Sequence, residues 1–378
     1  MRFPVLFLGL LASLHLPLAV AAEGYGSDTP GGAGGRELAV TNLQDEGPGS
    51  LRAALAEKGP RIVVFRTGGV IRLHKDLLID EPFLTIAGET CPADGPGISL
   101  VGAGLRVRTH DVIVRHLRIR VGDDSKGPRR ENRDGIGIGD ERSTVHHVLV
   151  DHCSVSWAID ENVQIWYPCH DITIQWCLIA ESLENAGHPK GAHGMGLLVG
   201  DHARRISVHH NLFAHNMERN PLLKGGTETE VMHNLIYNWR NYATGLGDHE
   251  RTGLIRADII GNVYLPGPDT KGRFGVGVDQ NLAAGSSVYL EGNTGPGRES
   301  GSGDEWALAK SYGTFPGRSA ERVLPPSGLS STPVPAPELQ AAILAGAGAT
   351  LPGRDSIDER VIRSVSEGSG RIIDSPPL

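Results

Sequence analysis

The sequence predicts an all-β protein: a parallel β-helix solenoid with an N-terminal capping helix and an irregular C-terminal tail. The first observation is that short strand-like segments recur every 23 to 36 residues from Leu117 to Asn293. The second is that glycine accounts for 51 of the 378 residues, while aromatic residues make up only 5%. Repeats of this size, rich in turns and poor in large side chains, are typical of stacked β-strand coils around a narrow core.

One column of residues joins the repeats. Helical repeats are excluded because the segments alternate apolar and polar residues with a period of two, and no leucine-rich repeat frame recurs. In stacked parallel strands each member of the column lies over the next, so asparagine amides can hydrogen-bond along the stack. The column consists of Leu117, Cys153, Cys177, Asn211, Asn234, Asn262 and Asn293.

The four cysteines leave two interpretations open. In an exported chain Cys91, Cys153, Cys169 and Cys177 could form disulfides, and three ways of pairing them exist. Because Cys153 and Cys177 are neighbours in the column, they could equally be stacked small hydrophobic residues. Their spacing matches no zinc-binding module.

The beginning of the chain predicts export. Residues 1–21 combine the positive start Met1-Arg2, an apolar run from Val5 to Val20 and the small residues that precede a cleavage site. This layout is typical of a secretory signal peptide, and the alternative, a retained anchor, is disfavoured because the run is short for a membrane span. We therefore expect a secreted protein, extracellular or periplasmic.

Both ends of the solenoid are expected to be capped. The segment Ser50–Gly59 has a serine cap, helix-forming residues and a terminal glycine, which predicts a short helix over the first coil. We expect the β-helix domain to cover residues 22–300. Residues 301–378 would form a tail packed on it, with short helices at Pro337–Leu344 and Asp355–Val365.

Charge limits the possible partners. The formal net charge of −8 argues against nucleic acid as a partner, and no second apolar stretch is long enough to span a membrane. We expect a monomer. An anionic substrate would have to be bound by local cations or by a metal ion.

Polar side chains gather on consecutive coils in the middle of the chain. Residues two apart share a face of a strand, so Asp160, Asn162 and Gln164 should point one way while Val163 and Ile165 enter the core. With Asp134 one coil earlier, this row of oxygen ligands suits a hard cation such as calcium. A solvated polar face is the alternative for this row alone.

Two loops beside this row carry cations. The segment Glu184–Gly196 is inserted between two coils and contains Lys190 and His193, and Arg219 and Lys224 flank Pro221 in the next loop. Loops on a rigid scaffold are where sites are usually built. The numerous histidines lack metal-ligand spacing and are interpreted as structural or groove-lining. Of the aromatic residues on these coils, most should pack between coils, although some could stack on a sugar ring.

At this point the motifs resemble those of the pectate lyase family. Val150–Trp157 reads VDHCSVSW, which is similar to the D-H-x-S segment of that family. His210-Asn211-Leu-Phe, followed by Arg219-x-Pro221-x-x-Lys224, resembles its H-N-x-F and R-x-P-x-x-R motifs. The segments that begin at Ala22, Val40, Gly47 and Arg354 are similar to the bacterial branch of the family, so the resemblance spans nearly the whole mature chain.

This resemblance implies a right-handed parallel β-helix and cleavage of α-1,4-linked polygalacturonate by calcium-assisted β-elimination, with residues 22–300 as the catalytic domain. It implies that Arg219 is the base and that Asp134, Asp160 and Gln164 hold Ca²⁺. We expect Lys190, His193 and Lys224 to contact the acidic polysaccharide.

The chain departs from the family pattern at three of these positions. Lys224 replaces the usual second arginine and loses bidentate carboxylate recognition. Gln164 replaces an acid, and Ile136 stands where some relatives carry aspartate. These changes predict weak calcium binding.

Two other functions remain in competition. A β-helix glycoside hydrolase or esterase acting on pectin would use paired carboxylates, for which Asp151, Asp160 and Glu161 are the candidates. A non-catalytic polysaccharide-binding solenoid would bind without turnover.

Overall fold

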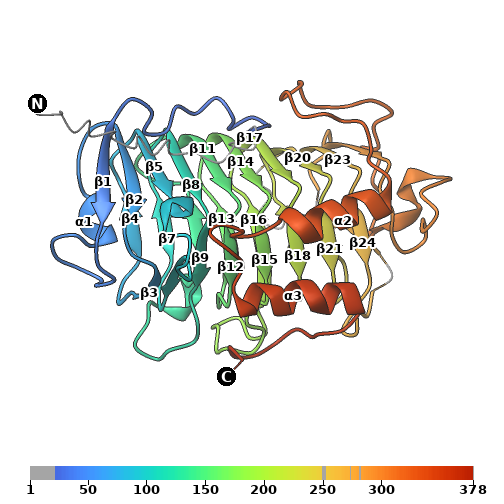
Figure 1. The fold of residues 1–378 in the computed structure, drawn as a ribbon. Coiled ribbons are helices and arrows are strands. Elements are labelled where there is room, and N and C mark those ends of the chain that lie inside the picture. Colours follow the sequence, from blue (N-terminus) through green and yellow to red (C-terminus); the bar gives the residue numbers. More distant parts are fainter. Residues whose placement is uncertain (1–21, 249–252, 273, 281, 378) are drawn as a thin grey trace, which may run out of the picture.

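The computed structural model describes residues 22–248, 253–272, 274–280 and 282–377, so the predicted signal peptide at 1–21 lies outside the described residues. The described chain forms a right-handed parallel β-helix whose three sheets contain ten, nine and eight strands (Figure 1). All paired strands within these sheets are parallel, and consecutive coils place residues in register. The predicted fold class is confirmed.

We call the sheets A, B and C. Sheet A contains β1 (Arg36–Val40), β2 (Arg61–Phe65), β5 (Leu84–Ala87), β8 (Val112–Arg115), β11 (His146–Asp151), β14 (His170–Gln175), β17 (Arg204–His209), β20 (Glu228–Met232), β23 (Arg256–Ile260) and β26 (Ser287–Glu291). Sheet B contains β3 (Gly69–Arg72), β6 (Ile98–Val101), β9 (Leu117–Arg120), β12 (Ser154–Ser156), β15 (Leu178–Ala180), β18 (Leu212–Ala214), β21 (Leu235–Tyr237) and β24 (Val263–Leu265).

Sheet C carries the candidate site. It contains β4 (Leu77–Ile79), β7 (Leu105–Val107), β10 (Ile136–Ile138), β13 (Glu161–Ile165), β16 (Met195–Val199), β19 (Leu222–Leu223), β22 (Thr244–Leu246), β25 (Val276–Val278) and β27 (Ala309–Ser311). The helices are α1 (Leu51–Leu55), α2 (Ala336–Gly346) and α3 (Ser356–Glu367), with 3₁₀ turns at Gly88–Thr90, Arg130–Asn132 and Glu305–Leu308. Because β27 pairs with β25, sheet C continues past residue 300.

The corner between sheets A and B explains the recurring histidine–asparagine pairs. On successive coils one residue takes a left-handed backbone with positive φ, and the column residue follows it directly. These corner residues are His116, His152, Trp176, His210, His233, Gly261 and Gly292. A single left-handed residue turns the chain sharply, so the next side chain points inward.

The asparagine column is confirmed. The Nδ2 of Asn211 donates to Asn234 Oδ1 over 3.0 Å, and Asn234 and Asn262 donate in the same way to the next member over 2.9 Å. Each Nδ2 from Asn211 to Asn293 also donates to a strand carbonyl, as in the 2.9 Å bond from Asn234 to Val208 O. All four asparagines are fully buried, so the ladder satisfies amide groups that water cannot reach.

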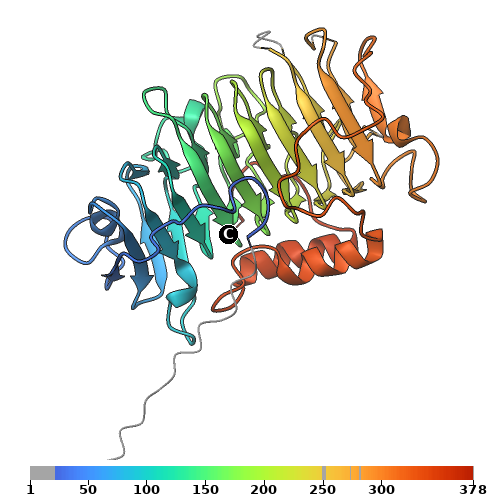
Figure 2. The ribbon, with the colours of Figure 1, turned by 90° about the horizontal axis from the view of Figure 1, so that it is seen from above.

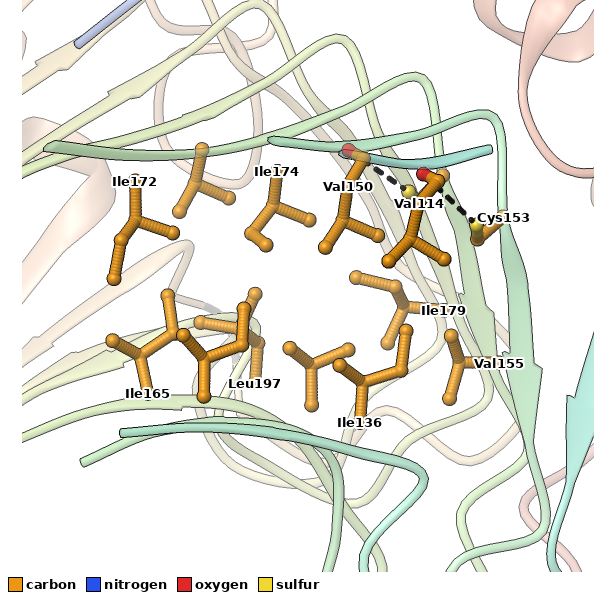
Figure 3. Packing of buried hydrophobic residues seen from close by; sticks show 14 of the residues in the cluster. Val114, Ile136, Val150, Cys153, Val155, Ile165, Ile172, Ile174, Ile179 and Leu197 are labelled. Carbon is orange, nitrogen blue, oxygen red and sulfur yellow. Dashed lines mark hydrogen bonds between the residues drawn. The ribbon is translucent and has the colours of Figure 1, made fainter. Parts of the chain in front are cut away.

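The cysteines are buried free thiols, so the disulfide interpretation is wrong. Cys153 and Cys177 lie over one another in the core among branched aliphatic side chains, and their Sγ atoms point to the carbonyls of Val114 and Val150 (Figure 3). Burial raises the pKa of Cys169 to about 12, which keeps it protonated and unreactive. The column therefore changes from stacked small hydrophobic residues to stacked amides along one axis.

The N-terminal cap is shorter than predicted. Ser50 Oγ accepts a hydrogen bond from the Ala53 N–H, as expected of a cap, but α1 ends at Leu55 with Ala56 as its C-cap, ahead of Gly59. Leu51 and Leu55 are buried and cover the first coil. The following residues up to Gly59 form the turn into β2.

The tail crosses back over sheet B. Its two helices match the predicted segments and run across the strands of that sheet, from coil to coil (Figures 1 and 2). Leu339, Ile343 and Val361 pack with sheet B residues such as Leu212. No helix among the described residues is long and apolar enough to cross a membrane. With sheet B covered, sheet C keeps an open face.

Candidate active site

A groove of about 870 Å³ runs over sheet C. It extends from the coil of β4 to the residues that follow β27, because Leu78 and Tyr312 both line it. Both positively and negatively charged side chains line the groove. The cations are Arg106, Arg108, Arg142, Lys190, Arg219 and Lys224, and the acids are Glu131, Asp140, Glu141, Asp160, Glu161, Glu218 and Asp279.

Three carboxylates converge at the start of β13. Asp134, which precedes β10, and Asp160 and Glu161, which open β13, each place one oxygen within 4.8 Å of the others. All three residues are buried. The register of β10 with β13 places Asp134 opposite Glu161, the first residue of β13, and next to Asp160, which directly precedes that strand.

Asp134 is held by its neighbours. Arg106 Nη1 donates to Asp134 Oδ2 over 2.5 Å, and the Glu161 backbone N–H donates to Oδ1 over 3.1 Å. Burial raises the pKa of Asp134 to about 6; the Asp160 charge adds to this rise and Arg106 opposes it. Although burial disfavours the charge of Arg106, the carboxylates of Asp134 and Asp76 raise its pKa.

The predicted row along β13 is wrong at one position. Val163 and Ile165 enter the core and Gln164 lines the groove, as expected. Asn162, however, points inward, where its Nδ2 donates to Ala180 O over 3.0 Å. The alternation fails because Asn162 and Val163, which are neighbours in the strand, both face inward, and Glu161 lines the groove.

Arg219 reaches the carboxylates from the next loop. Its backbone is fixed because the Gly196 N–H donates to Glu218 O over 3.0 Å and the Leu197 N–H donates to Arg219 O over 2.6 Å. The residue has a positive φ of 60°, a conformation that a non-glycine residue adopts only at some cost. The guanidinium Nη1 donates to Glu161 Oε1. The structure thus joins the predicted base to a carboxylate that the sequence reasoning assigned only to the hydrolase alternative.

The predicted substrate contacts lie at different depths. Lys190 is exposed in the loop above the cluster and lines the groove. Lys224 places its Nζ 4.4 Å from the centre of the Trp166 ring, a cation–π contact inside the groove. Tyr167 and Tyr242 also line the groove, whereas Trp239 is buried in the core.

His193 lies behind the groove lining rather than in it. Its Nε2 is 2.8 Å from Asp160 Oδ1, and its ring stacks on His188 with the centroids 3.9 Å apart. The residue is only 4% exposed. It therefore contacts a predicted cation ligand instead of open solvent, and we correct its expected place in the groove.

Asp151 does not belong to the carboxylate cluster. It ends β11 in sheet A, where it accepts hydrogen bonds from His152 Nδ1 at 2.6 Å and from Gln175 Nε2 at 3.0 Å. Asp151 is therefore not one of the paired acids expected for a hydrolase. Proximity in the sequence misled here, because residues 151 and 160 lie on different sheets.

The donor set fits a hard divalent cation. Carboxylate oxygens are the ligands that Ca²⁺ prefers, and three of them converge here. In addition, the buried His193 supports Asp160, because its Nε2 lies 2.8 Å from Asp160 Oδ1. A convergent cluster of buried carboxylates is the donor set that a hard cation requires.

The fold and the site together define a class: parallel β-helix proteins with a groove of carboxylates and cationic side chains on one sheet. No family model matches the chain. It is 37% identical over 278 residues to a probable pectate lyase C from Aspergillus flavus, covering 71% of this chain and 60% of that protein. It is 38% identical over 253 residues to a probable pectate lyase C from Neosartorya fischeri, covering 66% and 54%.

Solved structures show the same fold. The cedar pollen allergen jun a 1 superposes with a TM-score of 0.62 at 19% identity, covering 86% of this chain and 92% of that one. A Bacillus pectate lyase in complex with trigalacturonate gives 0.55 at 15%, covering 88% and 99%.

These comparisons support the pectate lyase family as the family of this chain. The chain spans a little over half the length of its curated relatives. Those relatives are fungal, so they do not support the predicted likeness to the bacterial branch.

Proposed function

We propose that this protein is a polysaccharide lyase that cleaves polygalacturonate by β-elimination. The observation that supports this most strongly is the meeting of Arg219 with the buried carboxylate cluster inside an open groove. The curated relatives are named probable pectate lyases, and one structural neighbour holds trigalacturonate. An acidic polysaccharide is therefore the proposed substrate.

In the proposed reaction Arg219 removes the proton at C5, next to the uronate carboxylate. The electron pair of that C–H bond forms the C4–C5 double bond while the C4–O4 bond breaks, and the leaving oxygen takes up a proton. No water is consumed. Lys224 and Lys190, both in the groove, are placed to neutralise substrate carboxylates, which favours charge that builds up next to C5.

Asp134, Asp160 and the neighbouring Glu161 or Gln164 would hold Ca²⁺. A bound calcium ion would supply positive charge to the substrate carboxylate and thereby acidify the C5 proton. The neighbouring cations of the groove act in the same sense. The loss of an acid at position 164 predicts that the ion binds weakly when no substrate is present.

A hydrolase is the second candidate, because Asp160 and Glu161 are paired acids. Both are engaged, however: Glu161 accepts from Arg219, and Asp160 contacts His193. A general acid has to be protonated and a nucleophile has to face the sugar. These contacts favour elimination over hydrolysis.

We further propose that the chain acts outside the cell as a monomer, with a catalytic domain that begins at residue 22 and extends beyond the expected boundary at residue 300, because β27 belongs to sheet C. The apolar leader in residues 1–21 and the acidic polymer substrate support export.

The test incubates the purified protein with polygalacturonate, with and without a chelator, and follows the ultraviolet absorbance of an unsaturated product. We expect absorbance to rise, and to fall to background when the chelator is present. Reducing ends without that absorbance would favour the hydrolase, and binding without any product would favour a non-catalytic solenoid.

A further inference from the structure

Glu161 contacts a cation through its side chain and an acid through its backbone N–H. Its Oε1 accepts from Arg219, while its own backbone N–H binds Asp134, the deepest member of the cluster. At 1% exposure Glu161 has no access to bulk water. A buried carboxylate without a cation beside it is strongly unfavourable, so Glu161 must be paired in every state of the site.

Gln164 cannot take this role. Its Nε2 donates to Glu161 Oε2 over 3.4 Å, so its amide supports the glutamate rather than replacing it. With an amide at position 164, Glu161 is the third carboxylate whose oxygen lies within 4.8 Å of the oxygens of Asp134 and Asp160. The negative charge that the cluster lacks at 164 is thus present at 161.

The burial of the three carboxylates points to a ligand in this cluster. Asp134, Asp160 and Glu161 are all buried, and each places one carboxylate oxygen within 4.8 Å of the others. Like charges held this close in a buried site are unfavourable unless cations lie beside them. The convergence therefore favours binding of a further cation, and carboxylate oxygens suit a hard one.

From these contacts, and on the basis of the proposed calcium-dependent lyase, we propose that Glu161 exchanges between Arg219 and the cation. Without the ion it pairs with Arg219 and holds the guanidinium against the cluster. When a divalent cation enters, Glu161 becomes its third carboxylate ligand and releases Arg219 toward the substrate. Glu161 is thus a positioning residue that makes Arg219 available only at a loaded site.

Exchange requires that Arg219 and the cation compete for one carboxylate. Removing Arg219 should therefore strengthen cation binding, and removing the Glu161 carboxylate should weaken it. The two effects should not add, because each acts through the same contact. If Arg219 instead weakened cation binding only through its positive charge, its removal would strengthen binding equally with glutamate or glutamine at position 161.

The experiment titrates CaCl₂ into the full-length mature protein in the absence of substrate and measures binding heats. The variants are Glu161→Gln, Arg219→Met and the double variant. We expect Glu161→Gln to weaken binding about tenfold or more, and Arg219→Met to strengthen it roughly threefold to a hundredfold. In the Glu161→Gln background, Arg219→Met should change the affinity by less than about twofold.

Lys224→Met is the matched control, because it removes another groove cation, one that lies over the Trp166 ring. We expect this variant to bind calcium within about twofold of the wild type. Thermal unfolding of each variant verifies that it folds.

Three results would overturn the exchange: wild-type affinity in Glu161→Gln, equal strengthening by Lys224→Met and Arg219→Met, or no calcium binding by the wild type. The lyase assay decides the proposed function separately, since product can form whether or not Glu161 exchanges.

Discussion

At the scale of single residues, Lys224 both packs on an aromatic ring and lines the groove. It lies over the Trp166 ring and faces the groove, so the indole holds the ammonium where a substrate carboxylate would come. The resemblance to the family placed a second arginine-like cation at this position. The structure adds the contact between Lys224 and Trp166. These residues are 58 positions apart in the sequence, so the contact could not be predicted from it.

Lys224→Ala should raise KM for polygalacturonate about tenfold or more, because a charged contact with the substrate is lost. Lys224→Arg keeps the charge and should stay close to the wild type. Initial rates over a range of polygalacturonate concentrations provide kcat and KM. An unchanged KM for Lys224→Ala would remove this residue from the substrate site.

Arg219→Lys should lose nearly all turnover, about a thousandfold or more, because the shorter ammonium cannot reach the position of the guanidinium. Folding should be retained, since the loop backbone is fixed by hydrogen bonds from Gly196 and Leu197. Single-turnover rates and thermal unfolding measure the two effects. Activity near the wild-type level would exclude Arg219 as the base.

At the scale of elements, the asparagine ladder could be predicted from sequence and the orientation of β13 could not. The ladder follows from repeat spacing, since residues one coil apart must stack. Strand alternation predicts Val163, Gln164 and Ile165 correctly. It fails for Asn162, whose amide donates to Ala180 O and Asn216 Oδ1, because these partners on other coils are not visible in the sequence of the strand itself. Glu161 was consequently assigned only to the hydrolase alternative.

Asn234→Ala should destabilise the protein by roughly 3 kcal/mol, because the buried Asn211 backbone N–H and Val208 carbonyl lose their bonds to the Asn234 amide, and two ladder bonds are broken. Chemical denaturation measures the loss. Asn185→Ala is the control: its side chain bonds Asp374 at the surface, and it should cost less than about 1 kcal/mol. Equal effects of the two variants would show that the ladder contributes little.

The C-terminal helix α3 is attached to sheet B by ion pairs between residues that are far apart in the sequence. Arg120 bonds Asp355 and the fully buried Asp358, more than 230 residues away in the chain. Arg120→Ala would remove the cation that bonds the buried Asp358 most closely and leave it Arg118 at 3.8 Å, at a cost of about 3 kcal/mol. We expect α3 to become the first site of limited proteolysis. A wild-type digestion pattern would contradict this role.

At the scale of the whole molecule, buried neutral histidines make stability depend on pH. Burial lowers the pKa of His116 and His210 to about 3 and that of His209 and His215 to about 4, from 6.5. The unfolded chain therefore binds more protons than the folded one below pH 6.5. The stability from these groups is complete above about pH 6.5 and is lost progressively as the pH falls toward their folded pKa values.

We expect the melting temperature to fall steadily between about pH 6.5 and pH 4. The raised pKa of Asp134, about 6, offsets part of this loss in the same range. His210→Phe keeps a stacked ring between Trp176 and His233 but cannot titrate, so its melting temperature should depend less on pH. Identical pH profiles for variant and wild type would show that His210 does not contribute.

The central claim is that the groove cleaves by elimination, which adds no water to the products. The most direct measurement digests polygalacturonate in water enriched in heavy oxygen and analyses the new chain ends by mass spectrometry. We expect unsaturated ends and no heavy oxygen incorporated during cleavage, after correction for exchange at the reducing end. Saturated products that carry one solvent oxygen for each bond cleaved would contradict elimination and establish a hydrolase.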